Sequence, residues 1–558
     1  MPTVESPRDV HDCPDLDTAT TMCDLLSSTA ARHPDAVAVR AYGSSAEWTY
    51  RQLMARATAV AVRLRGLGVS RGATVAIMLR NRPEFHVVDA AAMLLGAVPF
   101  SIYNTFAPGQ IRHVVTDAGA DVVITESCFV SVLAAARDLG TPIRHLLTVD
   151  EIVDDCAHLL AELATEDIDV DFDTAGRVQP GDLLTLIYTS GTTGPPKGVE
   201  LTHAGMLAQL RGVHAVAPLP RGGRQVSFLP AAHVADRWSS HYSALMTYAN
   251  TVTCVADTAD LPAALIETRP TVFGAVPRVW EKLKTALETA YPHDVAADAA
   301  ADPALAASLR EQLGLDQALW VITGAAPTPR AVVEFFLALG MPLCEMLGMS
   351  EASCVVATNT PDALRAGSVG RPLPTIETRL ACDGELLIRG PQIMRGYRGR
   401  PDQTAEAIDT DDWFHTGDVA RIDDGFLWIV DRKKELIINA AGKNMSPATI
   451  ELAIRSAGNL IAHACVIGEA RPYNVALLVL DPDTVAGVTT GDPVLHARVA
   501  EQVDRANATL SRVEQIKRFL ILEGNWTPGL QLTPTMKLRR AQITTMYAAQ
   551  INDLYDTH

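Results

Sequence analysis

The sequence predicts an α/β protein with a large N-terminal domain of mostly parallel sheets and flanking helices, a β-rich subdomain, and a small α+β C-terminal domain. Short apolar runs alternate with helical patterns up to about residue 350, which is typical of strand–helix–strand units. From about Ile376 the pattern changes to hairpins. After the charged stretch 431–434, strand and helix signals begin again.

The predicted strands of the first part are separated by segments long enough for crossover helices. The amphipathic segments 278–291 and 329–339 suit helices that cover a parallel sheet. Ligands in such folds bind beyond the carboxyl ends of the strands. The strands are predicted at 74–78, 121–125, 184–188, 226–229, 252–255, 272–276 and 319–323.

Turn residues and helix-cap residues divide the sequence after about Ile376 into a β-rich subdomain and a C-terminal domain. Apolar runs at 385–389, 419–422 and 426–430, the last two joined by the turn 423–425, predict the β-rich subdomain. Ser446 followed by Pro447 predicts the start of a helix. We therefore expect a large N-terminal domain at 1–430, a hinge at 431–434 and a small C-terminal domain at 435–558.

Composition restricts the class of protein. The 558 residues are 48% hydrophobic and 20% charged, as in globular enzymes with several lobes, and the net charge of −18 argues against a nucleic-acid partner. The nine cysteines form no C-x-x-C pair, so neither a zinc site nor a disulfide framework is indicated. The acidic N-terminus and the lack of any 18-residue apolar run predict a cytoplasmic protein, with peripheral membrane contact left open.

A loop rich in glycine and hydroxyl groups, 188–198, follows the predicted strand at 184–188. Glycines let the backbone approach an anion, hydroxyl and N–H groups donate to phosphate oxygens, and Lys197 adds a positive charge, so ATP is the expected ligand. Pro196 and Gly198 stand where a Walker A loop needs a glycine and a hydroxyl, which excludes that motif. A flexible turn is the alternative interpretation.

The full string of this loop resembles the signature of the AMP-forming adenylating superfamily, which includes acyl-CoA synthetases, peptide-synthetase adenylation domains and beetle luciferases. Further strings match in order from about Leu25 to Ile543. The resemblance implies that ATP phosphates are bound by Thr189, Ser190, Gly191, Thr192, Thr193, Gly194 and Lys197.

Three further strings concern the adenine, the metal and the acid. By resemblance, His233 lies between the carboxylate and the phosphates, and Glu351 with Thr192 binds Mg²⁺, which takes few protein oxygens alongside phosphates. Leu347 departs from the family, which usually has an aromatic residue there, so we expect weaker adenine stacking. The adenine is expected to lie against Gly324, Ala325, Ala326, Pro327, Leu347, Gly348, Met349 and Ser350.

The string 348–352 is also one residue short of the hydrolase motif G-x-S-x-G, which Ala352 breaks. A serine hydrolase is therefore disfavoured.

The C-terminal strings concern the ribose and the chemistry. By resemblance, Asp418 binds both ribose hydroxyls with help from Arg432, and Lys434 is the hinge of a mobile C-terminal domain. Gly442 is expected to reach the site in the rotated state and leave room for pantetheine. Lys537 is expected to bridge the attacking carboxylate and the α-phosphate. For each of these residues a solvated turn or surface charge is the alternative.

Together the strings predict a fatty-acid–CoA ligase that uses ATP, Mg²⁺ and coenzyme A. The segment 274–282 is similar to the long-chain branch, and a helix at 238–250 with the strand at 272–276 is expected to line the acyl site. Medium-chain, aryl and sterol side-chain acids stay open, as does the oligomeric state. The alternatives are an acyl-AMP ligase that loads a carrier protein, a luciferase-like oxidation of the adenylate, and a catalytically idle nucleotide- or acyl-binding protein.

Overall fold

The computed structural model describes residues 13–165, 178–189, 195–291, 293–440, 443–482, 484–485, 490–527, 529–533 and 536–556. Helices pack around the strands of the N-terminal part. Among them are α1 (Pro14–Thr18), α2 (Met22–Arg32), α3 (Tyr50–Gly66), α8 (His203–Val216), α9 (Val234–Asp236), η2 (Arg237–Thr247) and α15 (Pro401–Ala407). Among the described residues, none of the helices has both the length and the apolar character needed to cross a bilayer.

The first sheet is parallel and confirms the strands expected at 74–78 and 121–125. Its order is β4-β3-β5-β6-β7, with strands at Thr74–Met78 (β3), Val98–Ser101 (β4), Val122–Thr125 (β5), His145–Thr148 (β6) and Ala157–His158 (β7). The connections contain α4 (Pro83–Leu94), α5 (Pro108–Ala118), η1 (Ser127–Phe129) and α6 (Val130–Asp138), and α7 (Leu160–Leu163) follows β7. These helices serve as the crossovers that parallel strands require.

Two further sheets hold the strands predicted at 226–229, 252–255, 272–276 and 319–323. In one, β10 (Arg224–Ser227), β11 (Thr251–Cys254) and β1 (Val37–Ala41) run parallel and β2 (Glu47–Thr49) is antiparallel at the edge. In the other, β12 (Val272–Ala275), β13 (Trp320–Gly324) and β14 (Leu343–Met349) run parallel, followed by antiparallel β15 (Cys354–Thr358) and β16 (Arg371–Pro372). The helices of this part are η3 (Thr258–Asp260), α10 (Leu261–Thr268), α11 (Pro277–Ala290), α12 (Val295–Ala301), α13 (Pro303–Gln312), α14 (Arg330–Ala338) and η4 (Ser350–Ala352).

The glycine-rich loop connects a hairpin, which differs from the parallel arrangement expected for the strand at 184–188. Strand β8 (Leu183–Thr189) pairs antiparallel with β9 (Lys197–Thr202), and β19 (Gly396–Tyr397) joins the far edge of β9. The physical reason is the short connection, because parallel neighbours need a crossover of about a dozen residues or more. Thr189 and Lys197 are cross-strand partners at the mouth of the loop.

The β-rich subdomain forms as predicted, as an antiparallel sheet in the order β17-β18-β20-β21. Its strands are Glu377–Leu380 (β17), Glu385–Arg389 (β18), Phe414–Asp423 (β20) and Phe426–Arg432 (β21). The turn predicted at 423–425 joins β20 to β21, with Asp423 opposite Phe426. This hairpin also places Asp418 opposite Arg432.

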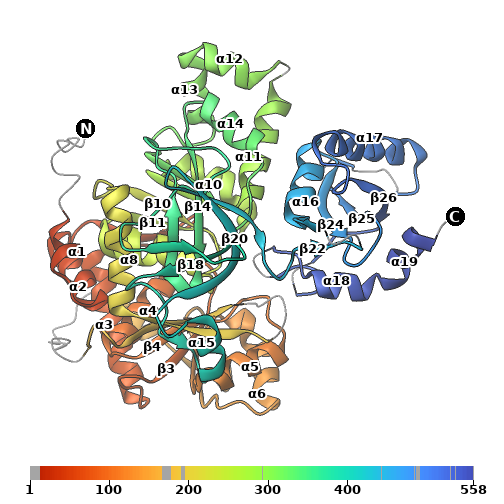
Figure 1. Cartoon of the computed structure of the whole chain (residues 1–558). Helices are drawn as coiled ribbons and strands as arrows, with labels where there is room; N and C mark the ends of the chain where they lie inside the picture. Colours follow the sequence, from red (N-terminus) through yellow and green to blue (C-terminus); the bar gives the residue numbers. More distant parts are fainter. Residues whose placement is uncertain are drawn as a thin grey trace.

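The C-terminal part has its own sheet, β24-β25-β26, with helices against it. Ser446 caps α16 by accepting a hydrogen bond from the Thr449 N–H, as its sequence predicts. In Figure 1 this part lies beside the rest of the molecule and faces α11. Its elements are β22 (Ile437–Ile438), β23 (Asn444–Met445), α16 (Pro447–Ser456), β24 (Ile461–Ile467), β25 (Asn474–Leu480), α17 (Pro493–Thr509), β26 (Ile516–Leu522), α18 (Arg540–Met546) and α19 (Ala548–Asp556).

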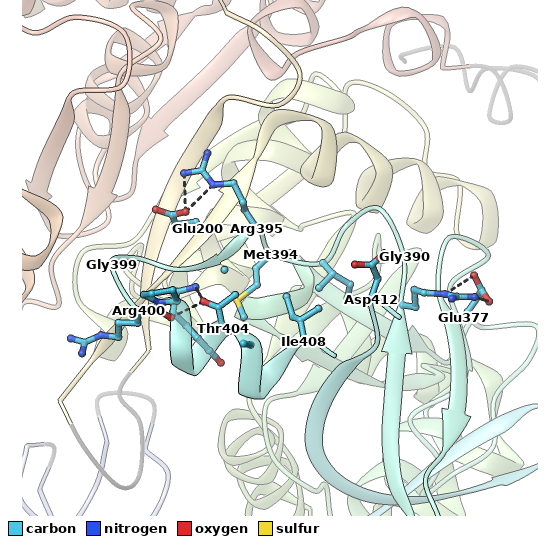
Figure 2. Close-up of a pocket in the computed structure, with 16 residues that line it drawn as sticks. Glu200, Glu377, Gly390, Met394, Arg395, Gly399, Arg400, Thr404, Ile408 and Asp412 are labelled. Atoms are coloured by element: carbon cyan, nitrogen blue, oxygen red, sulfur yellow. Dashed lines mark hydrogen bonds and ion pairs between the residues drawn. The ribbon is translucent and has the colours of Figure 1, made fainter. Parts of the chain in front are cut away.

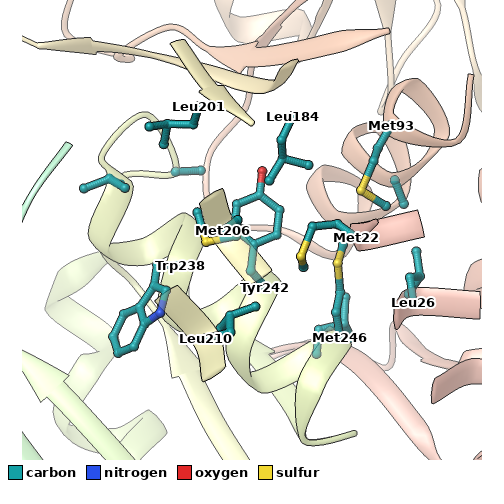
Figure 3. Close-up of a cluster of buried hydrophobic side chains, with 14 of the residues drawn as sticks. Met22, Leu26, Met93, Leu184, Leu201, Met206, Leu210, Trp238, Tyr242 and Met246 are labelled. Carbon is teal, nitrogen blue, oxygen red and sulfur yellow. The ribbon is translucent and has the colours of Figure 1, made fainter. Parts of the chain in front are cut away.

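The largest core of the N-terminal part consists mainly of leucine, alanine and valine side chains, with several methionines among them. Figure 3 shows Met22, Met93, Met206 and Met246 packed around Tyr242, drawn from α2, α4, α8 and η2. The segment η2 is a π-helix over 237–247, whereas the sequence predicted an ordinary helix over 238–250. Such segments are rare and are frequent at functional sites.

Candidate active site

The predicted phosphate-binding loop is described at its two ends. Thr189 and Lys197 lie opposite each other where β8 ends and β9 begins. The Lys197 ammonium lies 4.8 Å from the centre of the Tyr397 ring, a cation–π contact that holds the side chain beside β19. Ser190, Gly191, Thr192, Thr193 and Gly194 lie outside the described residues, and so does the predicted magnesium ligand Thr192.

Asp418 is held in the β20–β21 hairpin with one carboxylate oxygen paired and the other free. Arg432 Nε lies 2.7 Å from Asp418 Oδ1, while Oδ2 is buried and has no hydrogen-bond partner among the described residues. Burial raises the pKa of Asp418, although the charges of Arg432 and Lys537 act in the opposite direction. A buried acceptor without a partner is unfavourable unless a ligand donates to it, as ribose hydroxyls would.

Glu351 lies in the single turn η4, directly after β14. The Tyr397 hydroxyl donates to Glu351 Oε1 at 3.0 Å, and the Met394 N–H donates to the Glu351 carbonyl at 2.7 Å. Among the described residues no cluster of three or more His, Cys, Asp or Glu could hold a metal ion by itself. One carboxylate fits Mg²⁺ when phosphate oxygens and waters supply its other ligands.

In the predicted adenine wall, two glycines lie close to the backbone of neighbouring segments. A Cβ on Gly348 would lie 2.5 Å from the Cys354 carbonyl oxygen, and one on Gly324 would lie 3.0 Å from that of Met346. After Gly324 the chain turns through Ala325 at φ 69°, with Ala326 and Pro327 exposed. Leu347 is half-buried, while Met349 and Ser350 are buried. At both positions a side chain would collide with a neighbouring carbonyl oxygen, so glycine allows the backbone at the ends of β13 and β14 to lie close to its neighbours.

His233 begins the short helix α9. Its Nδ1 accepts the Ala235 N–H at 3.2 Å, so in the neutral ring the hydrogen is on Nε2. Burial lowers the pKa of His233 to about 4, and the charge of Lys537 contributes to this shift. The imidazole is therefore neutral near pH 7 and can donate through Nε2.

Lys537 comes from the C-terminal part and lies close enough to interact electrostatically with Asp418, Arg432, Glu351 and His233. Burial lowers the pKa of Lys537, and the Arg432 charge lowers it further. The residue nevertheless keeps an exposed surface, so water reaches the region and weakens these interactions. We call Lys537, Asp418, Arg432, Glu351 and His233 the interdomain site.

Two predicted residues stand apart from this group. Lys434 is exposed between Lys433, which forms ion pairs with Asp383 and Glu385, and Glu435. Gly442 lies outside the described residues.

Tyr397 was not predicted, because neither its spacing nor its neighbours in the sequence indicate that it reaches Glu351.

A surface pocket of about 860 Å³ lies next to the Glu351–Tyr397 pair. Figure 2 shows Met394, Thr404 and Ile408 on its apolar side and Arg395 paired with Glu200 at its rim. Tyr397 lines this pocket as well as contacting Glu351, but no described residue of the interdomain site does. The pocket is therefore a neighbour of the site and not its centre.

Sequence relatives and solved structures resemble much of this chain. A Mycobacterium tuberculosis protein, fadD11, assigned as a fatty-acid–CoA ligase, is 46% identical over 433 residues, covering 69% of this chain and 76% of its own. The long-chain-fatty-acid–CoA ligase FadD15 of Mycobacterium bovis is 34% identical, covering 89% of this chain and 90% of its own. An o-succinylbenzoate coenzyme A synthetase from Bacillus subtilis, solved with ATP and a magnesium ion, superposes with a TM-score of 0.72 at 22% identity, covering 93% of this chain and 99% of that one.

Two family models match nearly the whole chain. The AMP-binding enzyme model matches residues 26–398, and the model of the C-terminal domain of these enzymes matches residues 434–558. The first match alone exceeds half of the chain, and the structure contains the large and small parts that both models describe. The chain is therefore a member of the AMP-binding enzyme family.

Proposed function

We propose that this chain is a long-chain fatty-acid–CoA ligase that forms acyl-AMP from a fatty acid and ATP and then transfers the acyl group to coenzyme A. The observation that carries the proposal is the convergence of Lys537 with Asp418, Glu351 and His233. The amine and the three other groups come from opposite sides of a domain boundary. Two relatives named as fatty-acid–CoA ligases, at 46% and 34% identity, support the same activity.

In the first half-reaction, a carboxylate oxygen of the acid attacks the α-phosphorus of ATP and the bond to pyrophosphate breaks. Lys537 stabilises the negative charge that accumulates on the α-phosphate oxygens. Asp418 accepts from the ribose hydroxyls through its free Oδ2, and Arg432 fixes the orientation of this carboxylate. Neutral His233 donates through Nε2 towards the carboxylate or the phosphate. No side-chain nucleophile is required, because positioning and charge stabilisation suffice.

Magnesium would be held by Glu351 together with phosphate oxygens, and it would neutralise charge on the polyphosphate. Tyr397 keeps the Glu351 carboxylate in place through its 3.0 Å hydrogen bond. Thr192 completes the proposed ligand set.

In the second half-reaction, the CoA thiolate attacks the acyl carbon, a C–S bond forms, and AMP leaves as the C–O bond breaks. In this proposal the domain at 435–558 rotates against the domain at 1–430 about the hinge 431–434, with Lys434 absorbing the backbone change. Rotation withdraws Lys537 and presents Gly442. Exposure of Lys434 on a polar connection suits this role.

The experiment is an assay of AMP release with a panel of carboxylic acids, ATP, Mg²⁺ and free CoA. Long-chain acids should give AMP and acyl-CoA in equal amounts, identified by mass spectrometry. AMP without acyl-CoA would assign the chain as an acyl-AMP ligase for another acceptor, such as a carrier protein. No AMP and no pyrophosphate exchange with any acid would refute the ligase activity.

A further inference from the structure

The segment 274–282 makes contacts that its resemblance to the long-chain branch does not explain. Helix α11 begins at Pro277, so Arg278 and Glu281 lie one turn apart on the same helix face. Arg278 forms an ion pair with Asp481, and Glu281 Oε1 lies 3.1 Å from Arg455 Nη1. Both partners belong to the C-terminal part, and Figure 1 shows α11 on the side that faces α16. The segment therefore contacts the other domain.

These four residues form one line of alternating charge, Asp481–Arg278–Glu281–Arg455, which we call the interdomain ion-pair network. Its two middle members also form an ion pair, with Arg278 Nη1 3.4 Å from Glu281 Oε2. The carboxylates are the buried members, because the Asp481 side chain is 10% exposed and that of Glu281 is 16% exposed. Salt therefore screens these pairs less than it screens fully exposed ones.

The nearby His463 adds no charge to this contact. Burial lowers the pKa of His463 to about 4, and the positive charges of Arg455 and Arg278 lower it further. The network is thus electrically neutral near pH 7, with two acids and two bases.

The residues that contact α11 and Lys537 belong to the same packed part of the C-terminal domain. Arg455 and Asp481 adjoin Ile454 and Leu480, which belong to a core on one face of the C-terminal sheet. Leu532 and Leu538, on either side of Lys537, pack with Leu477 and the other face. Strand β25 contributes to both cores, so the ion-paired groups and Lys537 belong to one packed unit.

We propose that Arg278 and Glu281 are positioning residues for the adenylation step: through Asp481 and Arg455 they dock the C-terminal domain in the orientation that brings Lys537 to the interdomain site. The inference rests on the proposed ligase activity. Both pairs join the two domains, so both must separate when the C-terminal domain rotates for the CoA step. The network therefore favours the adenylation orientation over the other one.

The test exchanges the charges of each domain without changing its net charge. Arg278→Glu with Glu281→Arg reverses α11, Arg455→Glu with Asp481→Arg reverses the C-terminal side, and the fourfold variant pairs all four groups again. Lys284→Glu with Glu288→Lys is the matched control, because that ion pair lies within α11, with Nζ and Oε1 2.6 Å apart. Thermal unfolding identifies the variants that fold, and Arg278→Gln and Arg455→Gln replace any reversal that does not.

We expect each one-sided reversal to lower ATP–pyrophosphate exchange about tenfold, as a typical coupling between sites would. Thioester formation from supplied acyl-AMP and CoA should not fall, and the fourfold variant should recover most of the exchange. Equal loss in both half-reactions, or a fourfold variant no better than the one-sided ones, would overturn the positioning role. A change of similar size in the Lys284/Glu288 control would also overturn it.

Small-angle X-ray scattering of the ligand-free proteins separates this inference from the ligase proposal. One-sided reversal should broaden the distribution of interdomain distances, and the fourfold variant should restore it. Unchanged scattering in the one-sided variants refutes the docking. A wild-type protein that exchanges no pyrophosphate with any acid refutes the ligase activity, while the scattering still decides whether the network docks the domain.

Discussion

The Nε atom of Arg432 lies 2.7 Å from one carboxylate oxygen of Asp418, and the second oxygen of that carboxylate is buried with no hydrogen-bond partner among the described residues. The two residues are cross-strand partners in the β20–β21 hairpin, so the sheet register fixes their distance. The pairing keeps the carboxylate oriented and leaves one strong acceptor available. Each carboxylate oxygen has two lone pairs, so this oxygen can accept hydrogen bonds from the hydroxyls of the proposed ribose.

We predict that Asp418→Asn raises the KM for ATP about 10- to 100-fold, because hydrogen bonds to a charged group contribute about 1.5–3 kcal/mol. The KM for the fatty acid should change little, since Asp418 lies outside the segments 238–250 and 272–276 that are expected to line the acyl site. Steady-state AMP release at varied ATP measures both values. Asp423→Asn, exposed at the end of the same strand, is the control. An unchanged KM for ATP would remove Asp418 from the nucleotide site.

Lys537→Ala should lower the rate of adenylate formation about 10²- to 10³-fold, the usual effect of losing a group that stabilises a developing charge. Thioester formation from supplied acyl-AMP should be spared, because Lys537 acts only in the first half-reaction. Single-turnover assays of each half-reaction separate the two effects. Lys517→Ala, an exposed residue of β26, should behave as wild type in both. Equal losses in the two steps would contradict the division of roles.

Glu351→Gln should abolish most of the Mg²⁺-dependent activity, because an amide is a poor ligand for this cation. Tyr397→Phe keeps the carboxylate but removes the 3.0 Å hydrogen bond that orients it. We therefore expect the phenylalanine variant to need several times more Mg²⁺ for half-maximal activity, with near-normal activity at saturation. Magnesium titrations of pyrophosphate exchange provide the measurement. Full Mg²⁺-dependent activity in the glutamine variant would show that another group binds the metal.

The sequence was sufficient for the fold class and the main hairpins, because alternation of apolar runs and turn residues acts locally. The strand at 74–78 and the turn at 423–425 formed where this pattern places them. The pattern predicted the wrong direction of pairing for the strand at 184–188, since the antiparallel pairing of β8 with β9 depends on a short connection and not on residue types. It also failed for η2, because an ordinary and a π-helix have similar sequence patterns.

The site residues were predicted from the family resemblance. Their spacing in the sequence could not predict how they lie relative to one another. Lys537 and His233 are about 300 positions apart, and only the docking of two domains brings them together. The same holds for Arg278 and Asp481, which lie on different domains. Tyr397 contacts Glu351 because β19 joins the edge of β9, a pairing with no local signal.

His203 provides a test of stability against pH. Its Nδ1 accepts the Met22 N–H, its Nε2 is buried without a partner among the described residues, and burial lowers its pKa to about 4. In the unfolded chain a histidine has a pKa of about 6.5, so between these values the unfolded state binds more protons and stability falls as the pH falls.

We predict that the free energy of unfolding of wild type, relative to His203→Asn, decreases between pH 6.5 and pH 4 by at most about 1.4 kcal/mol for each pH unit. Urea unfolding of both proteins at several pH values gives this difference directly. A difference that is constant with pH would mean that His203 is protonated alike in both states.

Leu347 occupies the edge of the predicted adenine wall, where the family resemblance implies an aromatic residue. It is half-buried in β14 and pairs with Ala357. Stacking of a base on an aromatic ring contributes about 1–3 kcal/mol, so Leu347→Tyr should lower the KM for ATP at least about fivefold. Leu337→Tyr, at an exposed position of α14, should leave it unchanged. Because adenine is released as part of AMP, the tyrosine should also slow product release and lower kcat if that step limits turnover. A tyrosine variant whose KM for ATP equals that of wild type would place the adenine elsewhere than against residue 347.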